Sequence, residues 1–225
     1  DGVEDRARLL VGADGLASAV RRREGLEVRP RPPFRFGLRR HFAIAPWDDA
    51  VEVHFADGVE AYVTPAGSRR VGVAFLVEEE ARAPYFALLR RFPVLERRLA
   101  GVQLDSRLAG AGPFARSARA RVADRLVLLG DSAGYSDALT GEGVSLAFEA
   151  AFALAEVVPD ALARGADAPS LAPFARSASH RFRRYAAVAR LTLGIARRPA
   201  LRRGVLALAA RSPRTFSTVV GWAVG

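Results

Sequence analysis

The sequence predicts an α/β chain, α+β overall, in which two strand–turn–helix units flank a β-rich region. Two observations predict the flanks: apolar runs of strand length end in Gly and Asp, and small residues then lead into the 3.6-residue periodicity of a helix. A third observation predicts the β-rich region between them: residues 34–112 hold short β-rich segments broken by Pro and Gly. We therefore expect part of a parallel-sheet domain with an antiparallel sheet inserted into it.

The second flanking unit carries the stronger signal for a ligand. Leu126–Leu129 is apolar without alternation, as expected for a strand covered on both faces. Gly130 and Asp131 follow at its carboxyl end, where open α/β sheets bind ligands. A helix from about Gly141 would direct its first amides, left unobstructed by Gly143, toward negative charge. The pattern favours a polyhydroxylated, anionic cofactor, although an ordinary strand, loop and helix would also explain the glycines.

The first flanking unit repeats this arrangement. Leu9–Val11 is an apolar strand, the tight turn Gly12–Gly15 follows it, and small and polar residues mark the start of a helix. Alone, Asp14 and Ser18 could be only turn and helix-start residues, and Arg21 only a solvated charge. Two units of this kind in one chain favour a shared cofactor site.

Together the two units resemble a known superfamily. Gly12–Gly15 with Ser18, Val20 and Arg21 is similar to the DG motif of the single-component flavoprotein monooxygenases, and Gly130–Gly134 is similar to their GD motif. Asp137–Val144 is similar to the flavin loop of geranylgeranyl-reductase-like and halogenase-like members. The resemblance covers roughly residues 1–165. It implies a Rossmann-like domain that binds FAD, with NAD(P)H as the electron donor.

The resemblance also implies the site residues. Asp131 would bind the ribityl chain of FAD, the backbone around Gly143 and Val144 would meet the pyrimidine edge of the flavin, and the DG segment would couple the cofactor to NAD(P)H. Glu142 could tune the flavin or simply start the helix, which acidic residues favour. The expected cofactor-binding residues are Asp14, Gly15, Arg21, Gly130, Asp131, Gly134, Thr140, Gly141, Glu142, Gly143 and Val144.

A dinucleotide-binding fold should open with a strand, a GxGxxG turn and a helix, and this sequence has no such opening. We therefore expect it to be the C-terminal portion of a longer protein. The expected regions are two parts of the FAD-binding domain at 1–33 and 113–165, a substrate-side β-sheet domain at 34–112, and a C-terminal helical region at 166–225.

The middle region should form an antiparallel sheet followed by a helix. The helix is expected over about 15 residues, Glu79 to Arg91 or slightly beyond, before Pro93. In the superfamily an inserted sheet of this kind forms the substrate side of the flavin, so Arg40, His41 and Tyr62 become candidates for contact with substrate. Each could equally be an ordinary solvated or sheet residue. The expected strands are Phe36–Ile44, Val51–Phe55, Glu60–Thr64 and Val71–Val77.

Composition indicates a globular chain without metal or thiol chemistry. The 225 residues are 50% hydrophobic, with no cysteine and three histidines, so a disulfide and a structural zinc site are not expected. No apolar run is long enough to cross a bilayer, and we expect a cytoplasmic location.

The net charge of +10 does not indicate a nucleic-acid partner. Every basic residue is arginine, and 11 of the 34 arginines follow residue 167, where no acidic residue occurs. This tail is expected to form a helix with Phe174, Phe182 and Tyr185 on one face, and a second helix from about Pro199 to Ala210. Packing on the domain is favoured over peripheral membrane contact, which stays open.

The expected function is that of an FAD-dependent oxidoreductase. The leading hypothesis is an NAD(P)H-dependent monooxygenase of a small apolar or aromatic organic substrate, in which the cofactor carries the difficult step. The alternatives are a polyprenyl reductase of the geranylgeranyl type and a truncated chain without catalysis of its own. The resemblance favours a halogenase less, because its tryptophan-rich signature is missing around Pro46 and Trp47.

Overall fold

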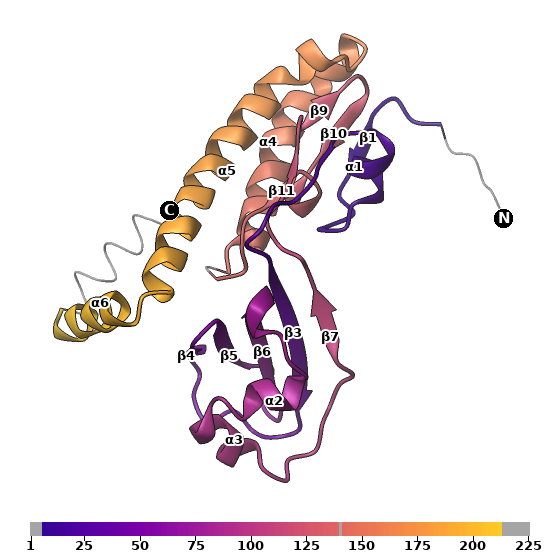
Figure 1. Ribbon diagram of the computed structural model, residues 1–225. Coiled ribbons are helices and arrows are strands. Elements are labelled where there is room, and N and C mark those ends of the chain that lie inside the picture. The colour runs from indigo at the N-terminus through magenta and orange to yellow at the C-terminus, as the bar shows by residue number, and fades with distance from the viewer. Residues whose placement is uncertain (1–5, 140, 213–225) are drawn as a thin grey trace. The chain divides into compact units, whose positions relative to one another are not determined.

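The computed structural model describes residues 6–139 and 141–212, and divides the chain into two compact units (Figure 1). Unit 1 comprises residues 1–30, 115–194 and 203–225, and unit 2 comprises residues 31–114 and 195–202. Each unit combines helices with sheet, so the predicted mixed α/β class is confirmed at that level.

A small parallel pairing organises unit 1. Strand β1 (Leu10–Gly12) runs parallel to β10 (Leu126–Leu128), and β9 (Val122–Ala123) pairs antiparallel with β10 on its other side. The register places Gly12 beside Leu128, so the two predicted Gly–Asp turns leave neighbouring strands at the same edge. A second sheet has the order β11–β8–β2, over Gly134–Tyr135, Arg116–Ala118 and Glu27–Val28.

Helices follow both turns of unit 1. The short α1 (Ala19–Arg23) follows β1, and the 21-residue α4 (Gly143–Ala163) follows β10 by way of a 3-10 turn, η2 (Gly130–Ser132), and the β11 loop. A core of buried apolar residues joins β10 to α4 and α5 (Ala168–Ala196). Its largest members are Val127, Leu154, Leu171 and Phe174.

Unit 2 contains a five-stranded sheet in which every pairing is antiparallel, in the order β4–β5–β6–β3–β7. Alternate residues of the strands point to one face, where they form a buried core with α2 (Tyr85–Leu89) and α3 (Pro93–Leu99). The strands are β3 (Arg35–Phe42), β4 (Glu52–Ala56), β5 (Val59–Pro65), β6 (Val71–Glu78) and β7 (Ala109–Ala111).

The prediction of a single helix from Glu79 to Arg91 is wrong. A 3-10 turn, η1 (Glu79–Ala81), is followed by extended backbone, and α2 begins only after Pro84. Proline has no amide hydrogen to donate and disfavours helical backbone in the residue before it, so Pro84 separates the two elements. Pro93 then occupies the first turn of α3, a position that proline suits.

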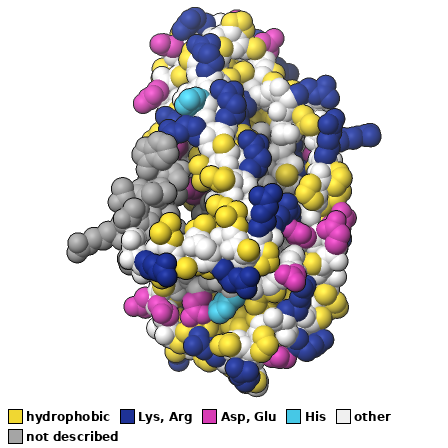
Figure 2. Space-filling model, turned by 60° about the vertical axis from the view of Figure 1, so that its left-hand side comes forward, with side chains coloured by type: hydrophobic (Ala, Val, Ile, Leu, Met, Phe, Trp, Pro, Cys, Tyr) yellow, Lys and Arg dark blue, Asp and Glu magenta, His cyan; other side chains and the backbone are white. Residues whose placement is uncertain are grey.

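The two predicted C-terminal helices are confirmed as α5 and α6 (Pro199–Arg211). Phe174, Tyr185 and Ala189 of α5 are buried, whereas Arg183 and Arg190 are exposed. Figure 2 shows arginines scattered among apolar side chains on one face of the molecule. Among the described residues, no helix is both long and apolar enough to span a membrane.

Candidate functional site

Asp131 lies at the carboxyl end of β10, within η2. Gly130 directly before it adopts a φ of +63°, which glycine accepts without strain, so the chain turns sharply as the strand ends. The Asp131 carboxyl is half-buried, and burial raises its pKa because partial removal from water disfavours the charged form. Among the described residues, no protein donor contacts this carboxylate.

An open groove of about 570 Å³ in unit 1 runs past Asp131. It is bordered by the two Gly–Asp turns and by one face of α4, whose Val144 and Phe148 are 68% and 61% exposed. A Cβ atom on Gly143 would lie 3.3 Å from the Tyr135 ring and 3.8 Å from Asp131 Oδ1. The glycine therefore keeps backbone, rather than a side chain, beside the carboxylate.

The N-terminus of α4 opens onto the same groove. Glu142 is the residue that caps this helix, and Gly143 and Val144 are its first helical residues. The first amides of a helix have no partner within it, and the dipole of a helix this long places partial positive charge at that end. The groove thus combines a hydrogen-bond acceptor at Asp131, amide donors on α4 and an apolar wall, which suits a flat ligand with hydroxyl and acidic groups.

Asp14 holds the start of α1. Its Oδ2 atom accepts hydrogen bonds from the amides of Ala19 at 2.6 Å and Val20 at 3.1 Å. Burial alone would raise the pKa of the carboxyl, but hydrogen bonds from Ser18 and from these amides hold its pKa below the usual value. The carboxylate is therefore engaged in capping, and its contact with a cofactor stays a prediction.

Arg21 is fully buried and ties the two Gly–Asp turns together. Its Nη1 donates to the carbonyl of Ser132 at 2.8 Å and lies 3.4 Å from that of Asp131, while its Nη2 donates to Leu16 at 2.7 Å and to Glu27 at 3.2 Å. The guanidinium thus contacts the backbone that carries Asp131, which makes Arg21 a positioning residue in this structure.

Sequence reasoning missed three side chains that support the site. The buried Ser132 hydroxyl lies within hydrogen-bond distance of the carbonyls of Gly12 and Leu129, so it joins the ends of β1 and β10. Asp137 accepts a hydrogen bond from the Leu139 amide, and the Tyr185 hydroxyl of α5 donates to the Asp137 carbonyl at 2.6 Å. Tyr185 is 48 residues from Asp137 in sequence, so no local pattern signals this contact.

The remaining predicted cofactor residues lie along the same turns. Gly15 and Gly141 border the groove with φ values of +77° and +72°, in the left-handed region that favours glycine. Gly134 is buried in β11, where a Cβ would approach the Phe182 ring to 3.3 Å. Thr140 falls outside the described residues.

The three substrate candidates of unit 2 do not share one face of the sheet. Arg40 pairs with Val73 and lies over the rings of Tyr85 and Phe86 of α2, on the helix-covered face. His41 and Tyr62 point to the opposite face, because neighbouring residues of a strand alternate and paired residues share a face. The pKa of His41 is lowered by burial and by Arg39 and Arg70.

Replacing Asp131 with asparagine is expected to stabilise the ligand-free chain near neutral pH. A carboxyl whose folded pKa lies above its unfolded value of 3.8 destabilises the fold when ionised, and this cost disappears as the pH falls through the folded pKa. The gain in urea unfolding free energy should therefore be larger at pH 7.5 than at pH 4.5. Asp49→Asn, in an exposed loop, is the control, and an equal gain at both pH values would contradict the expectation.

Comparisons with known proteins place this pair of strand–Asp–helix units in the class of FAD-dependent oxidoreductase folds. No family model matches the chain. Among solved structures, PqsL from Pseudomonas aeruginosa, described as a probable FAD-dependent monooxygenase, is 28% identical with a TM-score of 0.68, over 88% of this chain and 59% of that one. The flavin-dependent brominase Bmp2 covers 100% of this chain and 59% of its own at a TM-score of 0.82, but at 15% identity it shares only the fold.

Curated relatives give a more specific comparison. The digeranylgeranylglycerophospholipid reductase of Methanothrix thermoacetophila is 29% identical over 175 residues, and reductase 2 of Methanothermobacter thermautotrophicus is 30% identical over 176 residues. The matches cover 72% and 73% of this chain but only 43% and 44% of the relatives, so the chain spans less than half of their length. The chain belongs to the superfamily of FAD-dependent monooxygenases and geranylgeranyl-reductase-like flavoproteins.

Proposed function

We propose that this chain forms the ribityl- and pyrimidine-binding part of the FAD site of an oxidoreductase. The observation that carries the proposal is the Asp131 carboxylate, which is half-buried beside the groove and has no protein donor among the described residues. A carboxylate that is partly removed from water gains from a ligand that donates hydrogen bonds to it, and the hydroxyl groups of a ribityl chain are suitable donors.

The groove fits the cofactor in chemistry as well as position. Asp131 would accept hydrogen bonds from the ribityl hydroxyls, and the amides of Gly143 and Val144 would meet the pyrimidine edge, where the dipole of α4 stabilises negative charge. Val144 and Phe148 offer an apolar surface that keeps water from the ring system. When bound, FAD supplies the capacity to accept and donate a hydride.

The residues of this chain would act by holding the groove in shape. Arg21 and Ser132 fix the backbone on either side of Asp131, and Asp14 fixes the start of α1 beside it. No side chain of the groove needs to transfer a proton in this scheme. The protein contributes orientation, an acceptor for the ribityl chain and a fixed dipole, each in place before the reaction begins.

The reaction proposed first is reduction of carbon–carbon double bonds in an isoprenoid substrate, with electrons from NAD(P)H. The support is the shared name of five curated relatives, all digeranylgeranylglycerophospholipid reductases. Hydroxylation of an apolar or aromatic substrate by a monooxygenase is the second candidate. It is favoured by the likeness to PqsL.

A product-mass experiment separates the two candidate reactions. The natural full-length polypeptide is supplied with FAD, NAD(P)H and either a geranylgeranyl lipid or a panel of aromatic compounds, with and without oxygen. Double-bond reduction is expected to add two hydrogens per bond, independent of oxygen, whereas hydroxylation adds one oxygen atom and requires oxygen. If neither product forms although FAD is retained, both proposed reactions are wrong and only the cofactor site stands.

A further inference from the structure

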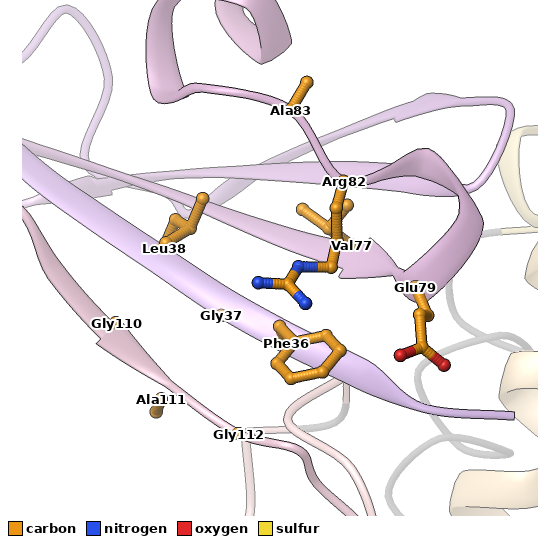
Figure 3. A pocket seen from close by; sticks show the side chains of 10 residues that line it. All are labelled: Phe36, Gly37, Leu38, Val77, Glu79, Arg82, Ala83, Gly110, Ala111 and Gly112. Atoms are coloured by element: carbon orange, nitrogen blue, oxygen red, sulfur yellow. The ribbon is translucent and has the colours of Figure 1, made fainter. Parts of the chain in front are cut away.

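A second cavity of about 650 Å³ lies entirely within unit 2, on the helix-covered face of its sheet (Figure 3). It is bounded by the edge strand β7, by the first half of β3 and by the segment from Glu79 to Ala83 that follows β6. His41 and Tyr62 point to the other face of this sheet, so the cavity is separate from those substrate candidates. Nothing in the proposed cofactor site uses its residues.

The floor of the cavity is apolar. Phe36 pairs with Val77, and Leu38 lies two residues further along β3, so the three side chains share the face that lines the cavity. A Cβ atom on Gly110 would lie 3.3 Å from Leu38 Cδ2, and one on Gly112 would lie 2.8 Å from Phe36 Cδ1. A side chain at either position would crowd the floor, so glycine there leaves Phe36 and Leu38 partly exposed, whereas Val77 is buried.

Two opposite charges border the floor. The Arg82 guanidinium lies over the Phe36 ring, with its central carbon 4.4 Å from the ring centroid, and Figure 3 shows it reaching across the cavity. Within the described part of the chain, this guanidinium has no ion pair and no hydrogen bond to protein. Stacking on a ring leaves its in-plane N–H groups directed outward, where they suit a carboxylate. Glu79 also lines the cavity, without an ion pair to Arg82.

The geometry points to a binding site for a small molecule with an apolar, ring-sized body and a single carboxylate. The body would lie against Leu38 and the part of Phe36 that Arg82 leaves exposed, and the carboxylate would meet Arg82. The volume lies within the range of known small-molecule pockets. Glu79 disfavours a ligand with a second negative charge, such as a phosphate monoester, because like charges repel across the cavity. The inference does not rest on the proposed flavin site.

Calorimetric titration of the chain with 2-naphthoate tests the site, with neutral 2-naphthalenemethanol and dianionic 2-naphthyl phosphate as comparison probes. Saturable binding of 2-naphthoate is expected, with each comparison probe weaker. Arg82→Gln should raise the Kd for 2-naphthoate about tenfold, the loss of roughly one charge-assisted contact, and leave that for the neutral probe nearly unchanged. Arg90→Gln, an exposed arginine at the end of α2, is the matched control.

Three further variants locate the site and test its charge. Gly110→Leu should fill the floor and abolish binding of both 2-naphthoate and the neutral probe, and Ala83→Leu, from another wall, should weaken both; thermal unfolding shows which variants keep the fold. Glu79→Gln should tighten binding of the phosphate probe about threefold. The proposal is overturned if 2-naphthoate does not bind saturably, if Arg82→Gln and Arg90→Gln have equal effects, or if folded Gly110→Leu and Ala83→Leu variants bind as the original chain does.

Discussion

Asp131→Ala is expected to raise the Kd for FAD by a factor of about 10 to 100, because it removes one or two charge-assisted hydrogen bonds to the ribityl chain. The effect should be large since the carboxylate has no other partner among the described residues and its position is fixed by buried neighbours. Flavin content of the purified natural-length polypeptide, followed by titration of the stripped protein with FAD, measures it.

Asp49→Ala serves as the control, because Asp49 is an exposed loop residue of unit 2. Its flavin content should equal that of the original protein. The two substitutions of Asp131 are expected to have opposite effects. Asp131→Asn stabilises the ligand-free fold, whereas Asp131→Ala weakens the complex with FAD. A variant with alanine at 131 that retains FAD normally would refute the assigned cofactor site.

Arg21→Met is expected to lower the free energy of unfolding by about 2–4 kcal/mol. The substitution keeps an apolar stem of similar length but leaves the buried carbonyl of Ser132 and the part-buried carbonyl of Leu16 without their Arg21 donor. It also leaves Glu27 with its longer ion pair to Arg116, at 3.7 Å, in place of the 3.2 Å pair to Arg21. Urea denaturation at neutral pH measures the loss.

The neighbouring Arg22→Met provides a matched comparison, because Arg22 is exposed on the same helix and its side chain donates, within the described residues, to the Ala17 carbonyl alone. It should cost less than about 0.5 kcal/mol. If the two variants lost equal free energy of unfolding, the buried hydrogen bonds of Arg21 would contribute no more to stability than the exposed contact of Arg22. Arg21→Met should also weaken FAD binding under conditions where it stays folded, since the Asp131 backbone loses one of its restraints.

The sequence was sufficient to predict the strands β3 to β6 of unit 2 and the two strand–turn–helix units, since each depends on local apolar patterning and on turn residues. It did not predict β7, whose residues Ala109–Ala111 are too small and too few to form such a pattern. It was not sufficient for the segment after β6. The acidic and apolar residues from Glu79 onward predicted one helix. In the structure Pro84 divides this stretch into the 3-10 turn η1 and the helix α2.

The candidate site was predicted in its turns but not in its internal supports. Asp131 follows a strand, and strand ends are visible in sequence. Arg21 was expected to bind the cofactor, with a solvated charge as the alternative. Its burial depends on carbonyl groups 110 and 111 residues further along the chain, which no local pattern reveals. Grouping Arg40 with His41 overlooked the alternation of a strand, which sends adjacent side chains to opposite faces.

The ends of the segment 31–114, the longer of the two stretches of chain in unit 2, have a consequence for evolution. The Phe114 amide donates to the Arg35 carbonyl at 2.8 Å, so the start of β3 and the end of this segment are hydrogen-bonded to each other. An insertion with adjoining ends can be lengthened, shortened or exchanged while the residues on either side keep their places. Exchange of such a segment is one physical route by which proteins that share a fold come to differ in activity.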